Sequence, residues 1–198
     1  MELTTNEQEA LKIVFTDYLA DRNAHNLKDA LGLSSVGTLK LLRRLEEKGL
    51  LIGKRMGNAI FYRANVGNDY AMKLLELLFM DHSALTSYVR GWVQELKAFG
   101  EAEAVLLFGS VLRVGKDAGD IDACFILRRH EDYTQAQKIV EEMNKRNRKR
   151  VHPLYLTVSD LKEKLREKDR PVVEMVRSCV VVSGQEAFVS ILREVQQA

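Results

Sequence analysis

Residues 104–127 read AVLLFGSVLRVGKDAGDIDACFIL, and the two apolar runs at the ends of this stretch decide the fold of the C-terminal half. The first run, 104–108, ends at Gly109-Ser110, and the second run, 121–127, begins directly after Asp120. Short apolar runs that are bounded by turn-forming residues are typical of buried β-strands. The stretch therefore predicts two strands of one sheet, joined by a polar loop.

The polar residues of this stretch predict a phosphate site and a metal site. A Gly-Ser turn at a strand end lets backbone N–H groups and a hydroxyl approach phosphate oxygens, as Gly109 and Ser110 would do. Side chains at i and i+2 of a strand point to the same side, so the carboxylates of Asp120 and Asp122 should face one ligand. Two carboxylates on one face can hold Mg²⁺, which prefers oxygen ligands and keeps positions open for phosphate.

This pattern resembles the DNA polymerase beta-like nucleotidyltransferase superfamily, whose hallmark is Gly-Ser, a variable loop, and then Asp-x-Asp. The resemblance covers roughly residues 101–184. It implies a mixed sheet flanked by helices, with a nucleoside triphosphate as ligand and Mg²⁺ as cofactor. The residues that it implicates are Gly109, Ser110 and Arg113 for the nucleotide, and Asp120 and Asp122 for the metal and for catalysis.

The third carboxylate of the family is missing. Active members supply it from a following strand, which here corresponds to 151–157 and reads VHPLYLT, without an acidic residue. His152 is a poor Mg²⁺ ligand because imidazole prefers softer metals. Asp160 lies beyond the strand, and no sequence signal places it in the site. The resemblance therefore predicts that the domain binds Mg-nucleotide, and it leaves catalysis as a separate question.

The remainder of this half alternates between strand and helix patterns. Such alternation predicts a sheet covered by helices. The expected strands are 151–157 and 180–182, and the expected helices are 132–145, 159–168, 171–177 and 185–195.

The N-terminal segment predicts three helices followed by a β-hairpin. The first helix, 6–19, has apolar residues at helical spacing, and Asn26 can cap a short second helix, 27–31. Ser34 can cap a third helix that ends before Gly49. Two short apolar runs follow, 50–52 and 59–63, with a Gly-rich basic turn between them, 53–58. This order is that of a winged helix-turn-helix.

Positive charge gathers on the third helix and the hairpin. Residues 1–33 carry three Lys/Arg and six Asp/Glu, whereas residues 34–63 carry seven Lys/Arg and two Asp/Glu. Such a segment attracts a polyanion. In a helix-turn-helix the second helix enters the major groove of double-stranded DNA. The predicted DNA-binding residues are Ser34, Ser35, Thr38, Lys40, Arg43 and Arg44 on the helix, and Lys54, Arg55 and Asn58 on the wing.

Residues 5–65 resemble winged-helix transcriptional regulators of the MarR and ArsR kind, on the run LRRLEEKGLL at 42–51 and on the wing. The resemblance implies DNA binding and transcription regulation. The alternative interpretation is a winged helix that binds another protein and whose basic residues form a solvated face.

The whole chain is therefore expected to be α+β, with three parts. Residues 1–65 are the predicted winged-helix domain, 66–100 a helical linker, and 101–198 the nucleotidyltransferase-like domain. The apolar faces of the linker can pack on the flanking domains or on a second copy of the chain, so a homodimer stays open.

Composition and termini favour a cytoplasmic protein without a membrane anchor. The chain has 198 residues, 46% of them hydrophobic, and a formal net charge of +2. Its N-terminus lacks the pattern of a signal peptide, and no apolar run reaches the length of a membrane span. The two cysteines, Cys124 and Cys179, lie in apolar runs and are expected to be buried thiols.

Three functions remain open at the level of sequence. The first is a DNA-binding regulator whose second domain senses a nucleotide or supports assembly. The second is an active nucleotidyltransferase that moves a nucleotide from Mg-NTP to a nucleic acid, a protein or a small molecule. The third is an antitoxin-like protein with a toxin-like partner, because minimal nucleotidyltransferases that resemble this domain often act beside a toxin subunit.

Overall fold

The computed structural model describes residues 2–100 and 102–197 and has the predicted α+β architecture, with helices and two small sheets. The chain divides into two compact units after residue 78, within the segment that the sequence assigns to a linker. The first unit comprises residues 2–78 and 197, and the second comprises 79–196. Each unit is described by itself.

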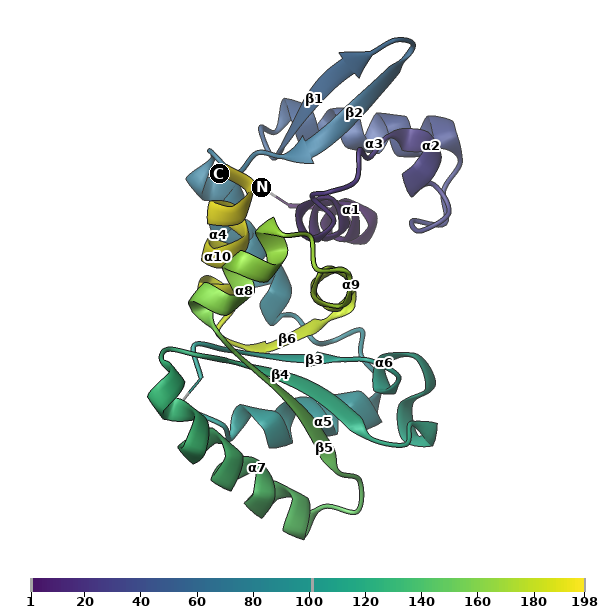
Figure 1. The fold of residues 1–198 in the computed structure, drawn as a ribbon. Coiled ribbons are helices and arrows are strands. Elements are labelled where there is room, and N and C mark those ends of the chain that lie inside the picture. Colours follow the sequence, from purple (N-terminus) through teal and green to yellow (C-terminus); the bar gives the residue numbers. More distant parts are fainter. Residues whose placement is uncertain (1, 101, 198) are drawn as a thin grey trace. The chain divides into compact units, whose positions relative to one another are not determined.

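The first unit begins with three helices and a hairpin, in the order predicted from the sequence (Figure 1). The helices are α1 (Thr5–Thr16), α2 (Ala24–Leu27) and α3 (Ser35–Glu47). The hairpin consists of β1 (Leu51–Met56) and β2 (Ala59–Ala64), which pair antiparallel. Fully buried side chains from α1, α3 and β2 form its core, among them Leu11, Phe15, Leu42, Leu45 and Tyr62.

Two local predictions in this unit were wrong. Asn23 caps α2, and its side chain accepts hydrogen bonds from the backbone N–H groups of His25 and Asn26. Asn26 lies inside the helix, where its side chain completes the capping box. The hairpin turn is also shorter than predicted, because β1 continues through Met56 and only Gly57 and Asn58 connect the strands. Such two-residue connections favour residues that tolerate positive φ, and Gly57 has φ +60°.

A helix pair follows the hairpin. Helix α4 (Asp69–Met80) crosses the division between the units, and α5 (Ser87–Lys97) belongs to the second unit. The sequence predicted a helical linker over 66–100, and the structure divides it into two helices, because the chain leaves α4 after Met80. Thr86 then caps α5 by accepting a hydrogen bond from the backbone N–H of Val89.

The second unit is built on a four-stranded mixed sheet in the order β5-β4-β3-β6. The strands are β3 (Ala104–Phe108), β4 (Ile121–Leu127), β5 (Val151–Thr157) and β6 (Val180–Ser183). Strand β3 is antiparallel to both of its neighbours, whereas β4 and β5 are parallel. The mixed character of this sheet confirms that part of the prediction.

Helices cover both faces of this sheet (Figure 1). The helices of this unit are α5 together with α6 (Val111–Val114), α7 (Tyr133–Arg146), α8 (Val158–Arg166), α9 (Arg170–Ser178) and α10 (Gln185–Gln197), and short 3₁₀ turns lie at Gly115–Asp117 and His130–Asp132. Leu107, Ala123 and Phe125 pack in one cluster with buried residues of α5 and α7. Leu106 and Cys124 are buried on the opposite face, where α8, α9 and α10 lie.

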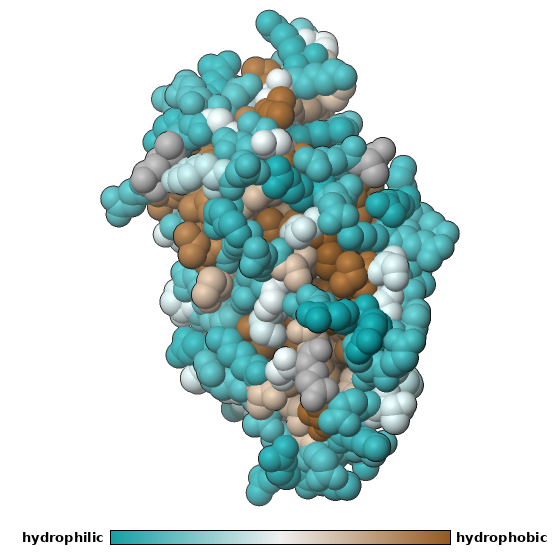
Figure 2. All heavy atoms as spheres, turned by 90° about the vertical axis from the view of Figure 1, so that its left-hand side faces the viewer, coloured by the Kyte–Doolittle hydropathy of each residue, from teal (hydrophilic) through white to brown (hydrophobic). Residues whose placement is uncertain are grey.

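The surface is mainly hydrophilic on the face that Figure 2 presents, with smaller hydrophobic areas between the polar side chains. Among the described residues, no helix combines the length and the apolarity that crossing a bilayer requires.

Candidate functional site

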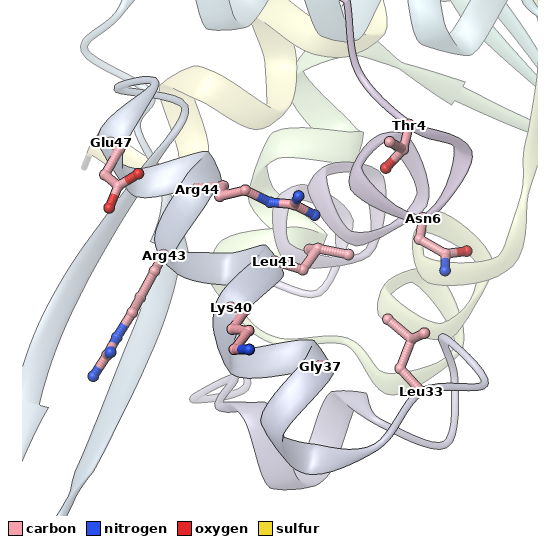
Figure 3. Close-up of a pocket in the computed structure, with 9 residues that line it drawn as sticks. All are labelled: Thr4, Asn6, Leu33, Gly37, Lys40, Leu41, Arg43, Arg44 and Glu47. Carbon is pink, nitrogen blue, oxygen red and sulfur yellow. The ribbon is translucent and has the colours of Figure 1, made fainter.

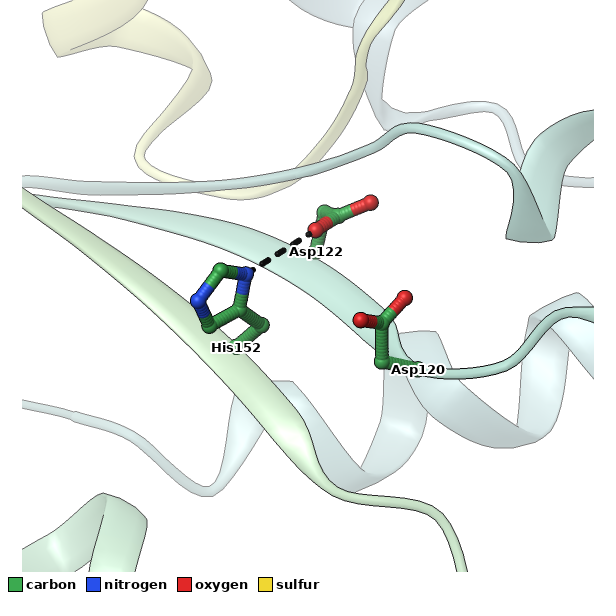
Figure 4. Close-up of side chains that lie close together, drawn as sticks. All are labelled: Asp120, Asp122 and His152. Atoms are coloured by element: carbon green, nitrogen blue, oxygen red, sulfur yellow. Dashed lines mark ion pairs between the residues drawn. The ribbon is translucent and has the colours of Figure 1, made fainter.

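The register of the central strands brings a histidine beside the predicted pair of aspartates. Asp122 lies at the start of β4 and is paired with Phe108 on one side and with His152 on the other. Because β4 and β5 are parallel, their paired residues lie side by side across the ladder. Asp120 directly precedes β4, so its carboxylate lies at the same end of the sheet (Figure 4).

These three side chains are close enough to share one cation. One ligand atom from each of Asp120, Asp122 and His152 lies within 4.8 Å of the other two. The Nδ1 atom of His152 is 3.5 Å from the Oδ1 atom of Asp122 (Figure 4). Asp122 is half-buried, whereas Asp120 and His152 are exposed. The cluster can therefore hold a metal ion and still present it to solvent.

Gly109 makes room for the carboxylate of Asp122. It adopts φ +82°, in the region that favours glycine. A Cβ atom at this position would lie 2.1 Å from Oδ2 of Asp122, which is far inside van der Waals contact. The glycine of the predicted phosphate-binding turn is thus a steric requirement of the aspartate position.

Ser110 and Arg113 lie on the turn that follows Gly109. Ser110 precedes α6, and its hydroxyl does not cap that helix. Arg113 and Gly109 line a pocket of about 500 Å³ together with residues of α9, among them Glu174. Asp120 and Asp122 do not line this pocket. The structure therefore brings the predicted nucleotide residue Arg113 beside Gly109, and the predicted metal residues together with His152.

Asp160 does not supply a third carboxylate. It lies in the first turn of α8, where it accepts a hydrogen bond from the backbone N–H of Thr157. That hydrogen bond holds the pKa of Asp160 below its ordinary value. Thr157 is five residues beyond His152 on β5, which corresponds to roughly 16 Å along a strand. Asp160 is therefore a capping residue at the other end of β5.

In the first unit, α3 and the hairpin form a groove of about 420 Å³. Four of the predicted DNA-binding residues line it, Ser35 and Arg43 from α3 and Arg55 and Asn58 from the hairpin. Exposed Val36 also lines this groove, and the sequence did not single it out. We call this surface the α3–hairpin groove.

The opposite side of α3 borders a second groove, of about 560 Å³, against the start of α1 (Figure 3). Lys40, Arg43 and Arg44 line it. Figure 3 shows that Arg43 points toward the hairpin and Arg44 toward α1, so the cations of α3 spread to both sides of the helix. Lys54, on β1, is exposed and lines neither groove.

The prediction that Thr38 contacts DNA is wrong. It is completely buried, and its hydroxyl donates a hydrogen bond to the backbone carbonyl of Ser34. It therefore has no surface to offer to a base. The Ser34 hydroxyl in turn accepts a hydrogen bond from the backbone N–H of Gly37 and caps α3.

Arg44 also has a role inside the unit. Its Nε atom is 3.3 Å from Oε1 of Glu7, a carboxylate that is 97% buried on α1. Lys48 lies 3.4 Å from the same oxygen, and the Thr4 backbone N–H donates a hydrogen bond to Glu7 at 2.9 Å. Burial alone would raise the pKa of Glu7, but these donors and cations outweigh it and lower the pKa. Arg44 thus stabilises the packing of α3 on α1.

Comparisons with protein-family models, with curated proteins and with solved structures give no match to this chain.

Proposed function

We propose that this chain is a DNA-binding protein of the transcriptional-regulator kind, whose first unit acts as a winged helix on double-stranded DNA. The observation that carries the proposal is the α3–hairpin groove, where Arg43 and Arg55 come from two elements and face one space with Ser35 and Asn58. Cations on a helix and on a hairpin suit a duplex, because the helix can enter the major groove while the hairpin meets the backbone.

The experiment is a fluorescence-anisotropy titration of a mixed-sequence duplex at several salt concentrations. The test variant carries Lys40→Gln, Arg43→Gln and Arg55→Gln. We expect the slope of log affinity against log salt to become shallower by about 0.9 for each phosphate contact that is lost. Arg44 stays unchanged because its pairing with Glu7 would confuse binding with stability.

The matched control removes the same charge elsewhere in the unit. Lys12→Gln, Arg63→Gln and Lys73→Gln change cations that line neither groove and form ion pairs with Glu9, Asp21 and Glu76. This control should retain most of the salt slope of the unchanged protein. Equal binding by the test variant and the unchanged protein would contradict the proposal and would favour a protein-binding role for this unit.

A second candidate function concerns the second unit, which we propose to be a nucleotidyltransferase-type domain that binds a metal-nucleotide. The cluster of Asp120, Asp122 and His152 favours it, because a bound cation there would neutralise phosphate charge. Gly109, which leaves room for Asp122, and Arg113 in the adjoining pocket supply the neighbouring surface for a triphosphate.

Whether this domain also transfers a nucleotide is tested by pyrophosphate release. The assay uses each nucleoside triphosphate with a divalent cation and with nucleic acid, protein or small-molecule acceptors. Release that disappears in Asp122→Asn would establish an active nucleotidyltransferase. Binding of the nucleotide without release would leave the domain as a nucleotide sensor in a DNA-binding regulator.

A further inference from the structure

We propose that His152 is a metal ligand and that the cluster of Asp120, Asp122 and His152 selects a first-row transition-metal dication over Mg²⁺. The inference rests on the metal-binding part of the second candidate function and does not depend on DNA binding. The sequence alone predicted a magnesium site from the two aspartates.

His152 lies where a metal ligand is needed. The parallel register pairs His152 with Asp122, so the imidazole is held on the strand next to the aspartate. Its Nδ1 atom is 3.5 Å from Asp122 Oδ1, and Asp120 completes a set of ligand atoms within 4.8 Å. Two ligands of one tetrahedral or octahedral ion lie roughly 3 to 3.5 Å apart, given metal–ligand bonds of about 2.1 Å. The observed spacing therefore needs little movement to accept an ion.

The ligand atoms of the cluster suit a transition metal better than they suit Mg²⁺. Mg²⁺ demands near-ideal octahedral geometry with oxygen ligands and gives up its water reluctantly. An imidazole ligand suits Zn²⁺, Fe²⁺ and Ni²⁺ better, and for a given set of N and O ligands affinity rises from Mn²⁺ through Co²⁺. Two carboxylates with one imidazole therefore fit a transition-metal ion, and they fit Mg²⁺ less well than three carboxylates would.

The site also leaves coordination positions open for a substrate. Three protein ligands with an open position are typical of metal sites that also hold water or a substrate oxygen. The side chain of His152 is 76% exposed and that of Asp122 is 24% exposed, so the open positions of a bound ion would face solvent. Gly109, whose missing Cβ leaves room for the Asp122 carboxylate, belongs to the turn that the sequence predicts to bind phosphate.

A simple surface ion pair is the competing explanation. An exposed imidazole–carboxylate pair contributes little stability and has no metal preference. The second unit contains such a pair in His130 and Asp160, whose Nε2 and Oδ1 atoms are 3.9 Å apart. That pair lies at the opposite end of β5 and has no second carboxylate in its cluster among the described residues. His130→Asn is therefore the matched control for His152→Asn.

The experiment measures binding of Mn²⁺, Co²⁺, Zn²⁺ and Mg²⁺ to the full chain by calorimetry, with the visible absorption of Co²⁺ as a second readout. We expect the three transition metals to bind more tightly than Mg²⁺. His152→Asn should weaken them by no less than the ~10-fold to 100-fold loss typical of second-shell ligand partners, and should change the Co²⁺ spectrum. His130→Asn should leave both readouts unchanged.

A variant that replaces the imidazole by a third carboxylate tests whether ligand chemistry sets the metal preference. His152→Asp should raise Mg²⁺ affinity relative to Co²⁺, because it converts the ligand set to oxygen alone. Equal affinities for Mg²⁺ and Co²⁺ in the unchanged protein, or an unchanged Co²⁺ spectrum in His152→Asn, would overturn the inference while leaving a metal site in place. Binding of no cation at all would overturn it together with the metal part of the second candidate function.

Discussion

The two candidate sites are held in different ways. In the first unit, long basic side chains project from the exposed sides of α3 and the hairpin, so their head groups can move while the grooves persist. In the second unit, short side chains on adjacent strands are set by register, and Gly109 leaves the Asp122 carboxylate its space. DNA binding at the first site depends on the sum of several charges and should weaken gradually as they are removed. Metal binding at the second site depends on geometry and should weaken sharply after a single substitution.

The largest expected effect comes from Gly184, which connects β6 to α10 in the second unit. Gly184 has φ +74°, and an added Cβ would lie 1.9 Å from the backbone carbonyl oxygen of Glu103. Gly184→Ala should therefore lower the free energy of unfolding of this unit by about 2 to 5 kcal/mol, from overpacking and left-handed strain together. Urea denaturation followed by the fluorescence of Trp92, the single tryptophan, measures it.

Gly57 in the hairpin is the comparison for Gly184. It also has positive φ, but an added Cβ would meet nothing within 4 Å. Gly57→Ala should lower the free energy of unfolding only by the strain of the left-handed backbone, about 1 to 2 kcal/mol. Hydrogen–deuterium exchange of the hairpin measures this cost. A decrease in the free energy of unfolding as large as that of Gly184→Ala would contradict this contrast between the tolerant hairpin and the tightly packed second unit.

An intermediate effect is expected at the metal cluster itself. Gly109→Ala should push the Asp122 carboxylate away and weaken Co²⁺ binding by about tenfold or more. Gly119→Ala is the control, because a Cβ there meets nothing within 4 Å. Calorimetry compares the Co²⁺ affinities of the two variants, and duplex-DNA binding should stay unchanged in each. Undiminished Co²⁺ binding in Gly109→Ala would show that register alone does not set this site.

The smallest effect concerns the acid stability of the first unit. Because the pKa of Glu7 is lowered from its ordinary value of 4.5, the carboxylate stabilises the folded unit at neutral pH. This contribution is complete above pH 4.5 and is lost as the pH falls through the lowered pKa. Glu7→Gln should therefore show faster hydrogen exchange in α1 at neutral pH, with a difference that shrinks in acid. A difference that grows in acid would contradict this sign.

Local sequence signals predicted most of the elements. The apolar runs 104–108 and 121–127 are strands with the predicted bounds, because short buried runs between turn residues have few other solutions. Ser34 caps α3 as predicted. The predictions failed where two residues of similar chemistry compete locally, as Asn23 and Asn26 do for the start of α2.

The parts of the sites that sequence missed depend on long-range packing. Thr38 was predicted to bind DNA because it lies near the start of the helix that would enter the major groove, but it packs inward, and Val36 is exposed on the groove instead. The cluster of His152 with the aspartates requires the parallel pairing of β4 and β5, two segments that are far apart in the sequence. The sequence resemblance already assigned His152 to the strand where the third carboxylate was missing and judged it a poor Mg²⁺ ligand, whereas its contact with Asp122 became visible only in the structure.

The pairing of Asp122 with His152 also has an evolutionary consequence. Because the register is set by backbone hydrogen bonds, the residue at 152 can change without any change in the strand that carries it. A histidine codon becomes an aspartate codon by substitution of its first base. Under the proposed role of His152, a single point mutation would give this chain a different metal preference, and the supply of cations would select between the two forms.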